Sequence, residues 1–137
     1  MNDCLFCRII AKEIPSTAIY EDENVYAFLD INPVNPGHTL VVPKVHSDGF
    51  HDASPETLEA LVRATQKVAN AIVASGLCEA FNLEENNGKA AGQVIPHLHL
   101  HIVPRRVDDK LGHWPGTPYV DDQEATVASK IRASLDA

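Results

Sequence analysis

The sequence is short of positive charge. Eleven Lys and Arg residues stand against 19 Asp and Glu residues, which gives a formal net charge of −8. Such a chain offers no broad basic surface to a phosphate backbone, so nucleic acid is not an expected partner. A small anionic ligand is still compatible with this charge, because a few donors in one pocket outweigh the net charge at short range.

Long apolar runs are also missing. No stretch approaches the length of a membrane span, and the first residues lack the basic and apolar character of a signal peptide. We therefore expect no membrane partner and a cytoplasmic location. The three cysteines are an odd number, and Cys4 and Cys7 are too close together to staple a fold. A reducing compartment or a metal site explains this usage better than a disulfide framework.

What is present is the composition of an ordinary globular protein. The 137 residues are 45% hydrophobic and 22% charged, without repeats or low-complexity tracts. This length suits one compact domain with a real core. We predict a single domain over residues 1–137, with a core at about 4–106 and a C-terminal extension at 107–137.

Helix and strand signals alternate along the chain. Ser54 as N-cap, Pro55 at the first helical position and Gly76 after the end delimit a long amphipathic helix. Period-two and turn patterns predict an antiparallel sheet of about five strands covered by helices, an α+β fold. The predicted helices cover 4–12, 54–75 and 121–134, and the predicted strands cover 18–21, 25–29, 39–42, 80–83 and 94–103.

Polar and apolar residues alternate strictly between Pro96 and Pro104. As a strand, this segment places His97, His99 and His101 on one face and the intervening apolar residues toward the core. A helix would spread the three histidines around its cylinder, and the flanking prolines oppose it. The segment is therefore predicted to present a row of imidazoles.

Two kinds of chemistry suit such a row. His97 and His101 would lie about 13 Å apart in a strand, too far to share one ion. Neighbours such as His97 and His99 could share a metal if another element supplied the remaining ligands. Alternatively, a neutral imidazole, available near pH 7, acts as a nucleophile while its neighbours donate hydrogen bonds.

The sequence closely resembles the histidine triad family, whose motif is His, apolar, His, apolar, His, apolar, apolar. All seven positions are filled from His97 to Val103. The resemblance runs from about residue 4 to residue 104 and includes segments 37–44 and 92–96. It implies a HIT-like fold with a short N-terminal helix, one long helix and a C-terminal helix.

The resemblance also implies a reaction. His99 would attack the α-phosphorus of a nucleotide, expel the leaving group and carry the nucleotidyl moiety until water removes it. His101 would donate a hydrogen bond to a phosphate oxygen or the leaving group, and His38 would support the triad. Gln93 and the amide groups near Gly92 would stabilise the oxyanion.

A nucleotide pocket follows from the same comparison. Asp30 matches a carboxylate that binds the ribose hydroxyls, and Asn86 matches a phosphate contact. We expect a purine base, on resemblance alone. The matching base-binding positions are apolar: Leu5, Phe6, Ile9, Phe28, Leu29 and Ile31. Their apolar spacing also fits an ordinary core.

The chain departs from the nucleoside phosphoramidase branch of the family. Val94 replaces a hydroxyl residue, so one hydrogen bond to the phosphate or leaving group would be missing. Pro104 and Arg105 stand where that branch has Gly-Gly-Arg, and Trp114 follows after a longer spacing. We therefore do not expect Trp114 to reach the site of a partner subunit.

A structural zinc site is the expected cofactor. The spacing of Cys4 and Cys7 gives only half a site. Bacterial family members with this N-terminus bind zinc through residues that match Cys4, Cys7, His46 and His97. Two half-buried cysteines that pack as small apolar groups are the ordinary alternative.

The resulting expectation is a homodimeric nucleotide hydrolase that uses a nucleotidyl-histidine intermediate and no catalytic metal. Its substrates would be nucleoside 5′-phosphoramidates, adenylylated compounds or dinucleoside polyphosphates. A catalytically weak nucleotide-binding regulator or scaffold is the main alternative. A metalloenzyme with His97 and His99 on a catalytic ion is the third.

Overall fold

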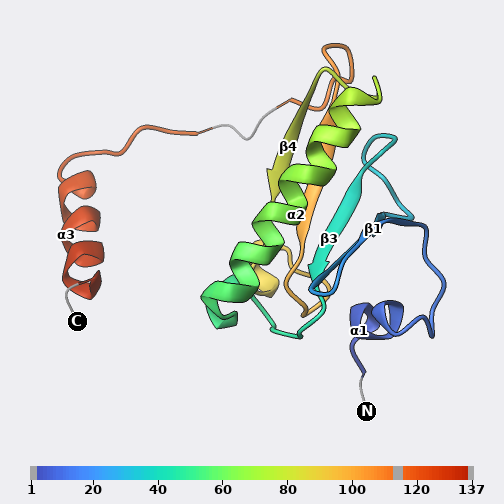
Figure 1. Cartoon of the computed structure of the whole chain (residues 1–137). Helices are drawn as coiled ribbons and strands as arrows, with labels where there is room; N and C mark the ends of the chain where they lie inside the picture. The colour runs from blue at the N-terminus through green and yellow to red at the C-terminus, as the bar shows by residue number, and fades with distance from the viewer. Residues whose placement is uncertain (1–2, 113–115, 136–137) are drawn as a thin grey trace.

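A computed structural model of the chain describes residues 3–112 and 116–135. Its centre is a five-stranded antiparallel sheet in the order β1-β2-β3-β5-β4 (Figure 1). The strands are β1 (Ala18–Glu21), β2 (Val25–Leu29), β3 (Thr39–Pro43), β4 (Ala80–Glu84) and β5 (Leu100–Arg105). The predicted α+β class with about five antiparallel strands is confirmed.

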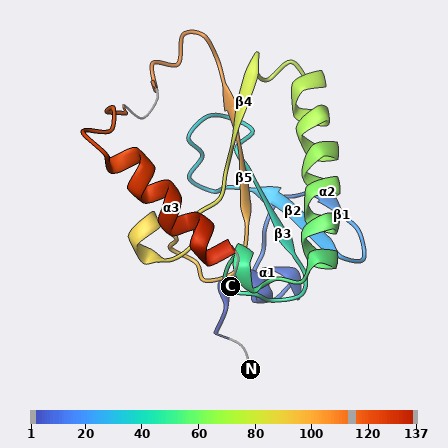
Figure 2. The same ribbon diagram turned by 90° about the vertical axis from the view of Figure 1, so that its left-hand side faces the viewer.

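Helix α2 (Pro55–Ala74) covers one face of the sheet. The side chain of its N-cap Ser54 accepts a hydrogen bond from the amide of Thr57, and Pro55 opens the helix as predicted. Figure 2 shows α2 lying alongside the strands. Its buried stripe forms a core with one side of β2, β3 and β5. That core includes Val25, Ala27, Val41, Leu61, Val68, Ile72, Leu98 and Ile102.

The short helix α1 (Leu5–Ile10) packs on the other face. Its buried Phe6 and Ile9 meet the alternate residues of β2 and β3, which include Tyr26, Phe28 and Leu40. Strands β2 and β3 are therefore buried on both sides, which explains their almost unbroken apolar sequence.

The third helix, α3 (Gln123–Leu135), has no buried residue and lies away from the sheet in Figure 1. Residues 113–115, and with them Trp114, lie outside the described residues. None of the helices in the described part of the chain is long and apolar enough to span a membrane.

The structure corrects one predicted element. The strand expected over 94–103 begins only at Leu100 and continues to Arg105. Before it, the amide of His97 donates to the carbonyl of Ile95, and the amide of Leu98 donates to the carbonyl of Ser47. These bonds go to a turn and a loop instead of a neighbouring strand, so His97 and His99 precede β5 and only His101 lies within it.

Candidate active site

A cavity of about 610 Å³ opens on the α1 face of the sheet. One wall is apolar. It contains the residues predicted to bind the base, which come from α1, from β2 and from the turn after β2. The polar groups come from the loop before β3, from the end of β4 and from the segment around β5. Among the predicted site residues, those lining it are Leu5, Phe6, Ile9, Phe28, Leu29, Asp30, Ile31, His38, Asn86, Gly92, His99 and His101.

His99 is buried and its ring is oriented by the main chain. Its Nδ1 lies 2.7 Å from the carbonyl oxygen of His97. A carbonyl only accepts, so Nδ1 carries the proton and Nε2 keeps its lone pair. The ring of Phe6 packs edge-on against His99 with centroids 5.0 Å apart. The ring nitrogen left for chemistry is therefore Nε2.

His38 and His101 form a hydrogen-bonded pair with defined tautomers. The amide of Val34 donates to Nδ1 of His38 at 3.1 Å, which leaves the proton of His38 on Nε2. That Nε2 lies 2.9 Å from Nδ1 of His101 and donates to it. The proton of a neutral His101 must then sit on its Nε2. His101 is thus set as a donor through its outer nitrogen.

Burial keeps these imidazoles neutral. Desolvation, together with the nearby His99 and His38, lowers the pKa of His101 to about 4, although the carboxylate of Asp30 opposes the shift. Desolvation also lowers the pKa of His38, although the carboxylates of Asp30 and Glu84 oppose that shift. At neutral pH the pair therefore donates through N–H groups without a positive charge.

Gln93 does not line the cavity. Its side-chain oxygen accepts from the amide of Gly88 at 2.7 Å, and its nitrogen donates to the carbonyls of Asp48 and Ile95. The side chain thus ties together the loop that carries Asn86 and Gly92.

Asp30 has one oxygen engaged and one near the histidine pair. Its Oδ1 accepts from the amide of Asn32 at 2.8 Å, and its Oδ2 lies 3.7 Å from Nε2 of His38. The side chain of Asp30 therefore caps the turn through Oδ1 and also lines the cavity.

Sequence reasoning missed Glu84. It lines the cavity and pairs directly across from His101 in the β4–β5 register. Directly opposed residues of an antiparallel pair project to the same face of the sheet. The register of β4 against β5 would therefore have placed Glu84 beside His101. That register was not readable before the true start of β5 was known.

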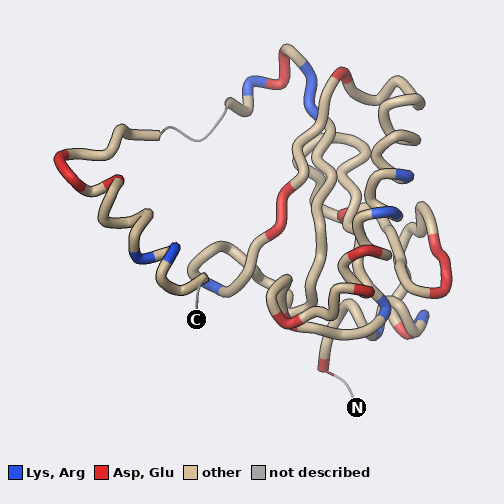
Figure 3. Tube along the Cα trace, turned by 60° about the vertical axis from the view of Figure 1, so that its left-hand side comes forward, with Lys and Arg blue, Asp and Glu red and all other residues tan. Residues whose placement is uncertain are grey.

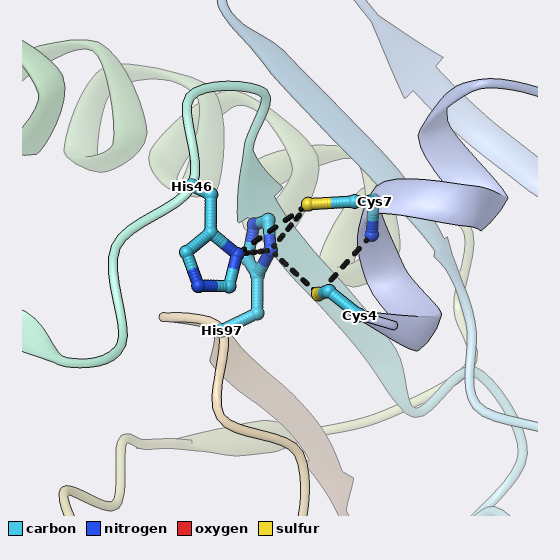
Figure 4. A group of neighbouring side chains, drawn as sticks. All are labelled: Cys4, Cys7, His46 and His97. Atoms are coloured by element: carbon cyan, nitrogen blue, oxygen red, sulfur yellow. Dashed lines mark hydrogen bonds between the residues drawn. The ribbon is translucent and has the colours of Figure 1, made fainter. Parts of the chain in front are cut away.

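Cys4, Cys7, His46 and His97 bring their ligand atoms together beside the cavity (Figure 4). Nδ1 of His97 lies 3.3 Å from Sγ of Cys4 and 3.5 Å from Sγ of Cys7. Nδ1 of His46 lies 3.4 Å from Sγ of Cys7 and 3.1 Å from Nδ1 of His97. In a tetrahedral zinc site, bonds of 2.0–2.3 Å separate ligand atoms by roughly 3.3 to 3.8 Å. The four residues therefore fit zinc with only small movements.

The outer nitrogens of both imidazoles support this reading. Nε2 of His97 donates to the carbonyl of Pro43 at 2.8 Å, and Nε2 of His46 donates to Oδ1 of Asp48 at 2.9 Å. Each bond leaves the lone pair of Nδ1 directed at the cluster, as hydrogen bonds from the other ring nitrogen do in metal-bound histidines. His99 belongs to neither group of potential ligands found among the described residues.

Two characterised relatives are similar to this chain. Adenylylsulfatase HINT3 of Arabidopsis thaliana is 44% identical over 110 residues, which cover 80% of this chain and 56% of the relative. Adenosine 5′-monophosphoramidase HNT1 of Saccharomyces cerevisiae is 36% identical over 136 residues, which cover 97% of this chain and 83% of the relative.

Solved structures share the fold. A HIT family protein from Bacillus subtilis superposes with a TM-score of 0.88 at 38% identity, covering 96% of both chains. A zinc-bound histidine triad family protein from Mycobacterium smegmatis superposes with a TM-score of 0.76 at 38% identity, covering 98% of this chain and 96% of the other. The family model of the HIT domain matches residues 11–108. With the histidine cluster, the fold and these relatives in agreement, this chain belongs to the HIT family.

Proposed function

We propose that this protein hydrolyses nucleotides through a covalent bond between the α-phosphorus and His99. The observation that carries the proposal is the hydrogen bond from Nδ1 of His99 to the carbonyl of His97. It fixes the tautomer whose Nε2 lone pair can attack phosphorus, in a cavity that also holds a ribose-binding carboxylate candidate, Asp30.

In the first step, Nε2 forms a bond to phosphorus while the bond to the leaving group breaks and its electron pair stays on the leaving atom. Negative charge on the phosphoryl oxygens and leaving atom is stabilised by the Nε2–H of His101. His38 holds that donor by its own hydrogen bond to Nδ1 of His101. In the second step, water displaces His99 from phosphorus and releases the nucleotide.

The proposed substrates are nucleoside phosphoramidates, adenylylated compounds and dinucleoside polyphosphates with a purine base. Leu5, Phe6, Ile9, Phe28 and Ile31 provide an apolar wall for the base. Val94 lines the cavity as well, where the phosphoramidase branch often has a hydroxyl group. The phosphate subsite would then rely on Asn86, on main-chain groups near Gly92 and on His101.

The test is capture of the intermediate. Labelled adenosine phosphoramidate is mixed with the enzyme, and the reaction is quenched within one turnover under conditions that preserve phosphohistidine. The protein is then digested, and its peptides are analysed by mass spectrometry. We expect AMP on His99 only. The matched control is His51→Ala, which removes an imidazole whose side chain is 75% exposed and outside the cavity. Equal turnover by wild type and His99→Ala would contradict the proposal.

We also propose that zinc is the ion held by Cys4, Cys7, His46 and His97. We call the cavity of about 610 Å³ the nucleotide cavity. The role of the zinc is structural, because it fastens α1, whose Leu5, Phe6 and Ile9 line that cavity. When bound it supplies four ligand bonds to the fold, and none of the proposed steps uses it.

A homodimer is the proposed assembly. Strand β4 is an edge strand of the sheet, and α3 buries none of its residues within the chain. Sedimentation at several concentrations tests this, and a monomer at micromolar concentration would contradict it. Cytoplasmic residence stays a prediction from the sequence.

A further inference from the structure

A second cavity, of about 360 Å³, adjoins the nucleotide cavity. The two share Val34 and Glu84, so they meet at these side chains. The register pairs Glu84 with His101 and Asn82 with Val103. These residues therefore face the same side of the β4–β5 pair, and the second cavity continues the nucleotide site along the strands beyond His101. We call this second cavity the β4–β5 groove.

The charge of the groove is set by Glu84. Arg105 also lines it, but its guanidinium binds both carboxylate oxygens of Asp109 at 2.8 and 3.1 Å, and the side-chain oxygen of Asn82 at 2.7 Å. Its positive charge is thereby neutralised. Figure 3 shows an acidic stretch (red) where β4 ends.

The nucleotide cavity offers no compensating cation. Its lining among the described residues contains the carboxylates of Asp30 and Glu84 but no lysine or arginine. The carboxylate of Glu84 is also close enough to His38 to act on it electrostatically. An anionic polyphosphate next to His101 would meet this negative charge without a partner, whereas an ammonium group would be attracted.

The geometry points to the β4–β5 groove as the leaving-group subsite, with Glu84 selecting leaving groups that carry a positive charge. This inference rests on the proposed function. With the base against α1, the leaving group extends from phosphorus past His101 into the groove. Among the proposed substrates, the preferred class is then a phosphoramidate whose amine bears a second, cationic group. On cleavage the amine takes the electron pair of the P–N bond and one proton from water.

The experiment compares three amides of AMP that differ only at the end of a two-carbon chain. One chain ends in trimethylammonium, one in its neutral isostere tert-butyl, and one in carboxylate. We expect wild-type kcat/KM to fall in that order. Glu84→Gln lowers the ratio of kcat/KM for the cationic amide to kcat/KM for the neutral amide about fivefold, which is the effect of one partly exposed charge pair. Glu84→Lys inverts the order of cationic and anionic amides.

Glu85→Gln is the matched control. It removes the same charge at the next position, from a side chain that lines neither cavity. We expect it to keep the wild-type ratios. If Glu84→Gln and Glu84→Lys leave the ratios unchanged while all three amides are hydrolysed, the subsite is wrong and the proposed function stands. If wild type hydrolyses none of them, the proposed function fails and this inference fails with it.

A steric test is independent of charge. Asn82 lines the groove and not the nucleotide cavity, and its side chain is exposed on β4. Because β4 is also the edge strand considered for the homodimer, sedimentation of the variant accompanies the kinetics. Asn82→Trp should raise KM for the tert-butyl amide about tenfold more than for unsubstituted adenosine phosphoramidate, because the indole fills the groove. Equal effects on both substrates would show that the leaving group lies elsewhere.

Discussion

The carbonyl oxygen of His97 lies 2.7 Å from Nδ1 of His99, while the ring of His97 directs its own Nδ1 at Cys4 and Cys7. One residue therefore connects the potential metal ligands to the proposed nucleophile. A disturbance of the cysteine and histidine cluster reaches the reactive imidazole through a single peptide unit.

Removal of the metal should loosen the nucleotide cavity. Chelation or Cys7→Ser is expected to raise KM more than it lowers kcat, since α1 carries part of the base wall. The free energy of unfolding should fall by about 4 kcal/mol if free zinc stands roughly a thousandfold above its Kd. Metal content, thermal unfolding and kinetics are the measurements.

The control for metal removal is Cys78→Ala, at a buried cysteine in the α2 core outside the cluster. It should bind about one zinc per chain, as wild type does. Undiminished stability and KM after verified metal loss from wild type would show that the ion has no structural role.

Gln93→Ala should destabilise the fold as well as the reaction. The change removes bonds to Gly88, Asp48 and Ile95, so we expect a loss of about 1–3 kcal/mol in the free energy of unfolding. Hydrogen exchange at the amide of Gly88 should accelerate. If stability and exchange stay unchanged while kcat falls, Gln93 contacts the phosphate directly and has no role in the loop.

Asp30→Asn should affect recognition of the sugar. Asn keeps an oxygen for the amide of Asn32 but loses the charge that we assign to the ribose hydroxyls. We expect kcat/KM for a ribonucleotide substrate to drop about tenfold, and the preference over the 2′-deoxy substrate to disappear. A preference that survives the substitution would place the ribose against another residue.

Stability of the folded chain should fall as the pH decreases from about 6.5 toward 4. The pKa of His101 is about 4 in the fold and about 6.5 in the unfolded chain, so the unfolded state binds the proton first. The stabilisation is complete above pH 6.5 and is lost through this window, at no more than about 1.4 kcal/mol per pH unit.

His101→Gln should reduce that slope when both proteins are unfolded by urea in the presence of chelator, which removes the separate effect of metal loss. Parallel profiles for the variant and wild type would assign the acid sensitivity to other groups.

The sequence was sufficient for the fold because its local signals agree with each other. Ser54 and Pro55 mark the start of α2, and the polar residues 22–24 mark the turn between β1 and β2. The start of β5 was placed six residues too early, because alternation persists through Pro96, His97 and His99, although the amides of His97 and Leu98 bond to a turn and a loop. Periodicity reports which side a residue faces and not which strand it pairs with.

The candidate site was less predictable than the fold. Cys4, Cys7, His46 and His97 were grouped by resemblance, and the fold brings them together from three separate segments. Gln93 was expected in the cavity, but its orientation depends on the positions of Gly88 and Asp48, which no local pattern specifies. Glu84 needed the β4–β5 register.

The burial of β2 on both sides makes adjacent residues in one strand serve different purposes. Val25 and Ala27 pack toward α2, whereas Tyr26 and Phe28 pack with α1, beside the nucleotide cavity. Substitutions at Val25 and Ala27 should therefore alter folding, whereas substitutions at Phe28, which lines the nucleotide cavity, should also alter ligand affinity. A scan of residues 25–28 would separate the effects of this strand on folding from its effects on ligand binding.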